Sequence, residues 1–287
     1  MIPQAELIAL LAPVKDDGYY LAPGPSPGGE LAEASLAAAA SLLRLKVPAL
    51  SRILSFGPPL PLSRVATPEE AALIGAGLRR CGIETVTVAH TELHLEVAAK
   101  KIRALEISDE ALKLIPVSGS EKVTMAWDEV TLVVAGRLIL NRQETEERKR
   151  RGRKQTVASR QLSSDESVLD LYAKSDEGSW RVNSNNFDFS CLGSAKGMTT
   201  FANFAALFSL LRERATQAQV DDSYNQVRLA LATVWPVEEQ TRKGDWRRSG
   251  AGKVDVATVT TTDNEAQFTR YSRLRHCLRL RELTDSK

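Results

Sequence analysis

The sequence predicts an α+β fold, in which a small α/β domain precedes an antiparallel β-barrel that is capped by a helix. A helical and irregular C-terminal extension is expected to follow. Three observations support this fold class. Residues 101–141 contain short apolar runs separated by turn signals, at the spacing of an antiparallel sheet. Residues 67–82 have a helix pattern between two strand patterns, and residues 199–214 have an aromatic helix pattern.

The length and charge of the chain set broad limits on its class. With 287 residues it is long enough for two domains, and a net charge of +2 gives no whole-protein argument for nucleic acid or an anionic membrane. The charge is uneven. Residues 1–99 carry seven basic and ten acidic side chains, whereas residues 242–287 carry eleven basic and six acidic ones. Positive charge is therefore concentrated towards the C-terminus.

Cysteine usage and the N-terminus indicate a cytoplasmic protein. Cys81, Cys191 and Cys277 form no CxxC pair, which fits a reducing compartment. The N-terminal residues lack a basic region before a brief apolar run, so we expect no secretory signal. No stretch approaches 18 uncharged apolar residues, so we expect no transmembrane segment.

The N-terminal domain is expected to span residues 1–95. Its clearest signal is Thr67-Pro68-Glu69-Glu70, which combines an N-cap threonine, a proline at the first helical position and a capping-box glutamate. Gly82 is a typical stop for the helix that follows. The other predicted elements are a Pro/Gly-rich loop at 22–29, helices at 30–45 and from Pro48, and strands at 60–65 and 83–88.

This order of elements resembles a known small domain. The segment LSRIL followed by LPLSRVATPEEAALIGAGLRRCGIETVTV, within residues 36–88, is similar to the α/β domain shared by the ribosomal stalk protein C-terminus and the adaptor of Clp proteases. The resemblance implies a domain that contacts another protein. It supplies no binding residue.

The second domain is expected to span residues 96–216. Further strands are predicted at 168–172, 179–182 and 186–192. A helix should begin at Thr199 or Thr200, with Phe201, Phe204, Phe208 and Leu211 on one face. Residues 143–167 lack periodic apolar side chains and are therefore expected to form a long mobile loop inserted in the domain.

A strand series followed by one aromatic helix resembles a bacterial pleckstrin-homology-like domain, over residues 101–214. Trp127-Asp128-Glu129-Val130, followed by Gly136-Arg137, is similar to a strand of some bacterial members. The resemblance implies a barrel whose helix covers one open end. The C-terminal extension, residues 217–287, is expected to contain a helix at 222–234, a strand at 254–261 and an amphipathic segment at 268–280.

Motifs that could support catalysis or metal binding are incomplete. Gly250-Ala251-Gly252-Lys253 lacks the first glycine and the hydroxyl of a phosphate-binding loop. His90 and His94 have the spacing of a zinc pair, but no helix is predicted there. Asp128 and Glu129 would point to opposite faces of a strand, and Asp188 between two phenylalanines would point outward. We therefore expect no enzyme, no cofactor and no metal site.

A basic run is the sharpest candidate site. Its cations are Arg148, Lys149, Arg150, Arg151, Arg153 and Lys154. The Arg-Gly-Arg core resembles an AT-hook, although Lys154 replaces the usual proline. Three interpretations remain open: a solvated loop, a nucleic-acid contact, or a contact with anionic phospholipid or an acidic protein.

The combined prediction is a non-catalytic cytoplasmic protein-interaction or regulatory module whose partner is another protein. The alternative is nucleic-acid or anionic-lipid binding through residues 148–154. A second basic and aromatic group, with Trp235, Trp246, Arg247 and Arg248, is expected to pack against its own domain.

Overall fold

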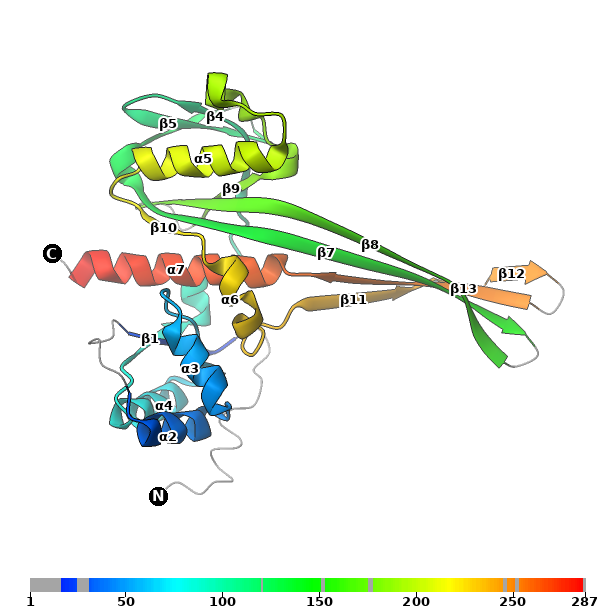
Figure 1. The fold of residues 1–287 in the computed structure, drawn as a ribbon, viewed down its shortest axis with the longest axis horizontal. Helices are drawn as coiled ribbons and strands as arrows, with labels where there is room; N and C mark the ends of the chain where they lie inside the picture. Colours follow the sequence, from blue (N-terminus) through cyan, green and yellow to red (C-terminus); the bar gives the residue numbers. More distant parts are fainter. Residues whose placement is uncertain are drawn as a thin grey trace.

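The computed structural model describes residues 17–24, 31–119, 121–150, 153–174, 178–244, 247–250 and 253–285. Helix α7, Glu265–Asp285, runs through the middle of the molecule (Figure 1). An N-terminal lobe lies on one side of α7 and a curled sheet lies on the other, while a long β-arm projects away from both (Figure 1). The fold is α+β, and the sheet is a curled half-barrel.

The N-terminal lobe contains a three-stranded sheet covered by helices. Strand β1 lies in the centre and is antiparallel to both neighbours, β2 and β3. The bounds are β1 Tyr19–Pro23, α2 Glu33–Leu43, α3 Val47–Ser55, β2 Ser63–Val65, α4 Pro68–Arg80, β3 Thr85–Ala89 and a 3-10 turn, His90–Leu93. The predicted capping box of α4 is confirmed, because Thr67 Oγ1 accepts from Glu70 N and Glu70 Oε2 accepts from Thr67 N. Strand β1 was not predicted from the sequence.

The curled sheet has the order β7-β8-β9-β4-β5-β6. Its bounds are β4 Lys100–Ile107, β5 Ala111–Pro116, β6 Val123–Ala126, β7 Val130–Arg150, β8 Arg153–Ala173 and β9 Trp180–Asn183. Helix α5, Thr200–Arg214, packs onto it through buried Phe204, Leu207, Phe208 and Leu211. Thr199 Oγ1 caps α5, as predicted. Phe201, which was expected on the same buried face, is 69% exposed.

Three sequence expectations in this region are wrong. Residues 143–150 and 153–167 lie in the paired antiparallel strands β7 and β8 instead of a loop. Residues 186–192 form no strand, because 3-10 turns at Ser184–Asn186 and Phe189–Ala195 occupy the segment. Asp128 and Glu129 lie in a 3-10 turn, Trp127–Glu129, where the Glu129 carboxylate accepts from Ala126 N at 2.9 Å.

The C-terminal extension supplies the centre of the molecule. It contains β10 Gln219–Asp221, α6 Tyr224–Leu231, β11 Glu238–Lys243, β12 Arg247–Gly250, β13 Lys253–Asp263 and α7. Phe268, Tyr271 and Leu274 of α7 belong to the same buried cluster as the core of the N-terminal lobe and the inner part of β7. Trp235, 1% exposed, is also in this cluster, which confirms its predicted packing. Trp246 lies outside the described residues.

Candidate functional site

The long β-arm is the feature of this fold that compact packing does not explain. The arm consists of residues 140–150 of β7, residues 153–164 of β8, and strands β11, β12 and β13. Strand β13 pairs with residues 140–150 of β7, and β8 pairs with the same residues on the other edge. Eleven residues of β7 extend roughly 35 Å at about 3.3 Å per residue, so the arm reaches well beyond the body (Figure 1).

Buried polar groups anchor the base of the arm to the body. Asn264, which joins β13 to α7, accepts from Ile139 N at 2.6 Å and donates to the Arg137 carbonyl at 3.0 Å. Its amide also donates to the Tyr224 hydroxyl at 3.0 Å. That hydroxyl donates to Gln267 Oε1 at 3.0 Å, and burial raises the pKa of Tyr224. These hydrogen bonds fix the direction in which the arm leaves the body.

A buried ion pair holds the start of α7 against the sheet. Arg181 of β9 donates to both carboxylate oxygens of Asp170 of β8, at 2.7 and 2.8 Å. The two side chains are 3% and 0% exposed. Burial opposes the charge of Arg181, but the neighbouring Asp170 carboxylate outweighs burial and raises the pKa of Arg181. Arg181 also contacts Glu265 and Thr269, which lie in the first turns of α7.

The shaft of the arm, the part between its base and its end, is exposed. Arg137 pairs with Asp165 at 2.7 Å at the base, and Arg142 pairs with Glu144 at 2.8 Å on the shaft, with all four side chains at least 38% exposed. Leu140 and Leu162 are each 42% exposed. A sheet with water on both sides lacks the apolar face that normally stabilises strands. The shaft therefore depends on its backbone pairing and on its anchored base.

The end of the arm brings together two basic segments that are about one hundred residues apart in sequence. Arg150 is in register with Arg153 on one side and with Lys253 on the other, and Lys149 is in register with Lys154. Strand β12 adds Arg247 and Arg248, in register with Asp255 and Val254 of β13. Asp255 is also in register with Arg148, so these register pairs of described residues include one acidic residue.

The predicted basic run thus lies beside further basic residues. Arg148, Lys149, Arg150, Arg153 and Lys154 lie in β7 and β8, while Arg151 lies outside the described residues. Arg247 and Arg248 were expected to pack against their own domain, but they lie in β12 at the end of the arm, and the position of Lys253 beside Arg150 was not predicted. The signal was available, since polar β-prone runs flank the glycines at 250 and 252 as they would in a hairpin.

Among the described residues, the histidine, aspartate and cysteine side chains considered for metal binding or catalysis make structural contacts. Within the described part of the chain, no group of three or more His, Cys, Asp or Glu side chains could hold a metal ion. The Tyr20 hydroxyl bonds His90 Nδ1 at 2.8 Å. Asp188 points outward as predicted and accepts from Ser190, which lowers its pKa. His276 stacks on Tyr172, and burial raises the pKa of the Cys277 thiol to about 11, which disfavours a thiolate nucleophile.

Comparison with known proteins gives no further assignment. No protein-family model, curated protein or solved structure matches the chain.

Among the described helices, none alone has the length and apolar character needed to cross a membrane. Helices α2 and α3 meet that criterion only together, with a bend of 102° between them.

Proposed function

We propose that this protein is a non-catalytic nucleic-acid-binding protein that contacts a duplex with the end of its arm. One observation carries the proposal: cations occupy directly opposed register positions, Arg150 with Arg153, Arg150 with Lys253, and Lys149 with Lys154. Like charges directly opposite each other destabilise a sheet. A polyanion that covers the arm end would offset this repulsion.

The shape of the arm favours a duplex over a flat anionic surface. A two-stranded β-ribbon fits the major groove, which is about 12 Å wide, and arginines also insert into the minor groove. The arm end consists of two such hairpins, β7–β8 and β12–β13, so in this proposal one hairpin enters the groove and the other contacts the flanking backbone. The support for this geometry is that the basic register positions lie at the far end of a long projection, whereas Arg137 at its base and Arg142 nearer the body pair with acidic side chains. If residues 143–167 formed a solvated loop, which is the simplest interpretation of the sequence, they would not need to pair with other strands.

The test is the salt dependence of duplex binding. A fluorescent 24-base-pair DNA of arbitrary sequence is titrated with the full-length protein at several salt concentrations. The R148Q/K149Q/R150Q variant should bind more weakly, with a log–log salt slope that is smaller by up to about three.

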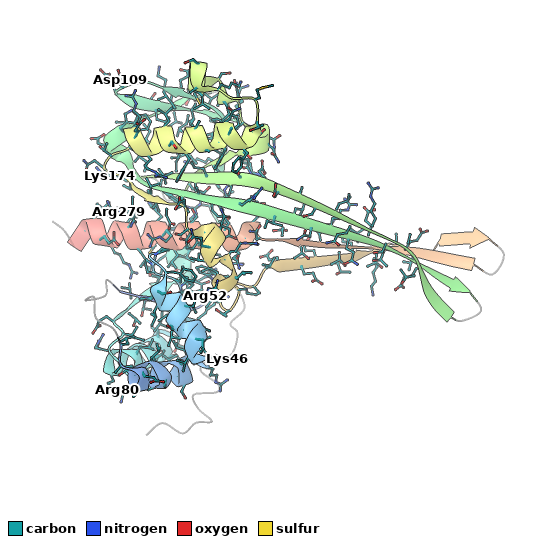
Figure 2. All side chains as sticks on the ribbon, viewed as in Figure 1. Lys46, Arg52, Arg80, Asp109, Lys174 and Arg279 are labelled. Carbon is teal, nitrogen blue, oxygen red and sulfur yellow. The ribbon has the colours of Figure 1, made fainter. Side chains whose placement is uncertain are left out.

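A matched control removes the same charge elsewhere. Lys46, Arg52 and Arg80 lie on the N-terminal lobe, away from the arm (Figure 2). The K46Q/R52Q/R80Q variant should retain the wild-type slope. Equal loss in both variants would show only a net-charge effect and would contradict the proposal. Binding to phosphatidylserine vesicles but not to duplex would assign the arm to a membrane surface instead.

The pleckstrin-homology-like interpretation of residues 101–214 and the division at residues 95 and 216 belong to the same proposal. Their support is the element order, since β4 to β9 precede a helix that packs on the curled sheet. The parallel pairing of β4 with β9 departs from a purely antiparallel barrel. In this proposal the half-barrel serves as the rigid base from which the arm extends.

A further inference from the structure

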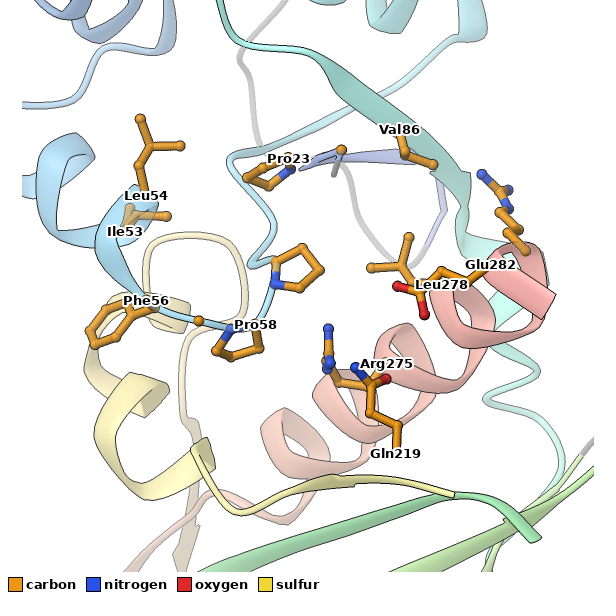
Figure 3. Close-up of a pocket in the computed structure, with 14 residues that line it drawn as sticks. Pro23, Ile53, Leu54, Phe56, Pro58, Val86, Gln219, Arg275, Leu278 and Glu282 are labelled. Atoms are coloured by element: carbon orange, nitrogen blue, oxygen red, sulfur yellow. The ribbon is translucent and has the colours of Figure 1, made fainter. Parts of the chain in front are cut away.

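A cavity lies between the N-terminal lobe and α7 (Figure 3). Its volume is about 510 Å³, within the range of small-molecule sites. The N-terminal lobe supplies an apolar wall that includes Ile53, Leu54, Phe56, Pro58 and Val86. The facing wall contains Arg275 and Leu278 of α7, with Gln219 of β10. The cavity is therefore apolar on one side and polar on the other.

Arg275 is the residue that gives this cavity its chemistry. Its side chain is 5% exposed, and its Nε donates to Asp221 Oδ2 at 2.7 Å. Asp221 also accepts from the Tyr271 hydroxyl at 2.7 Å and from Ser223, so its position is fixed. Figure 3 shows the guanidinium of Arg275 directed into the cavity. Among the described residues, no acceptor meets its two terminal amino groups.

The other polar groups near the cavity are arranged differently. Arg281 donates to the Thr87 carbonyl and to Glu92, and Glu282 pairs with Arg279 at 3.2 Å. Gln219 makes no side-chain hydrogen bond within the described part of the chain, and its amide rises beside Arg275 at the cavity floor (Figure 3). The donors available to a ligand are thus the outer fork of Arg275 and the Gln219 amide.

We propose that this cavity binds a small amphipathic monocarboxylate. A guanidinium has donors and no acceptor, so its ligand must supply acceptor oxygens. The planar fork matches a carboxylate with two parallel hydrogen bonds, and low exposure strengthens such charge-assisted bonds. The aliphatic or aromatic body of the ligand packs against Leu54, Phe56 and Pro58. This site is separate from the arm and does not depend on its function.

Octanoate and octanamide are suitable probes, because they differ in the charge of the head group. Calorimetric titration of the full-length protein should give octanoate an affinity about tenfold higher than octanamide. The Q219E variant places a carboxylate beside the fork and should weaken octanoate binding by about tenfold while leaving octanamide unchanged. The Q217E variant is the matched control, since Gln217 is exposed two residues away and does not line the cavity.

Each outcome decides the proposal, provided that thermal melting shows the variants to be folded. Loss of octanoate binding in Q219E but not in Q217E supports it. Equal affinity of the two probes for the wild type would overturn the carboxylate assignment. Equal loss in both variants, or no octanoate binding to the wild type, would show that the cavity is not such a site.

Discussion

Gly136 is a single residue on which the junction of arm and body depends. It lies in β7 where the ring of Phe268 crosses the strand. A Cβ at this position would stand 2.6 Å from Phe268 Cε2 and 2.8 Å from Tyr224 Cδ1. Both rings are fully buried, so neither can move aside without disturbing the core.

The G136A variant should therefore lose roughly 1–3 kcal/mol of unfolding free energy, the usual cost of overpacking. Chemical denaturation monitored by circular dichroism measures this loss. G57A is the control, because a Cβ at Gly57 meets nothing within 4 Å. Equal stability of G136A and the wild type would contradict the packing described at this crossing.

The buried Asp170–Arg181 pair gives a second residue-scale prediction. Replacing Asp170 by Asn leaves a buried guanidinium without its full counter-charge, which should cost on the order of 3–5 kcal/mol. The matched variant is D165N on the same strand, whose pair with Arg137 is about half exposed and should contribute less than about 1 kcal/mol. Comparable denaturation midpoints for the two variants would contradict the claim that the buried Asp170–Arg181 pair stabilises the fold.

At the scale of elements, local signals in the sequence were sufficient for helices and insufficient for the arm. The α4 capping box and the Thr199 cap of α5 are each encoded within a few residues, and both were predicted. The buried face of α5 was also predicted, apart from Phe201. Strand β1 was missed because Tyr19–Pro23 borders a Pro/Gly-rich stretch that masks its pairing.

The outer parts of β7 and β8 were missed for a physical reason. Both faces of the arm contact water, so the strands lack the alternation of apolar and polar residues on which strand prediction depends. The pairing of β7 with β13 joins residues more than one hundred positions apart. The basic residues at 148–154 were therefore predictable from one run of cations. The basic residues of β12 and β13 could be placed beside them only from the register of these strands.

This register makes a prediction about the second hairpin. R247Q/R248Q should weaken duplex binding and lower the salt slope by up to about two, although these residues are distant in sequence from residues 148–154. The matched pair is R79Q/R80Q, two adjacent arginines at the end of α4. If R247Q/R248Q gave the same salt slope as R79Q/R80Q and the wild type, the two hairpins of the arm end would not act as one binding surface.

At the scale of the whole molecule, α7 connects the N-terminal lobe to the sheet. Arg281 donates to the Thr87 carbonyl at 2.8 Å and to the Glu92 carboxylate at 2.5 Å. Burial opposes ionisation of Glu92, but the Ala89 amide and Arg281 outweigh it and lower the pKa of Glu92 below 4.5. A carboxyl with a lowered pKa stabilises the fold above its unfolded pKa, and this stabilisation is lost as the pH falls through the folded pKa.

The E92Q variant should therefore be less stable than the wild type at neutral pH. The difference should shrink as the pH falls below the ordinary value of 4.5. Urea denaturation at pH 7 and at successively lower pH values measures it. In the R281Q background the same substitution should have a smaller effect, because the hydrogen bond from the Ala89 amide then favours the Glu92 carboxylate without the contribution of Arg281. A stability difference between E92Q and the wild type that does not change with pH would contradict this linkage.

The central claim, that the arm end binds a nucleic-acid duplex, is tested most directly by hydrogen–deuterium exchange with and without DNA. The structure predicts slower exchange on DNA binding in peptides that cover residues 142–158 and 242–258, with the N-terminal lobe unchanged. Both peptides should respond together, because residues 253–263 of β13 pair with residues 140–150 of β7. Protection confined to another surface, or no protection at DNA concentrations that saturate binding, would contradict the claim.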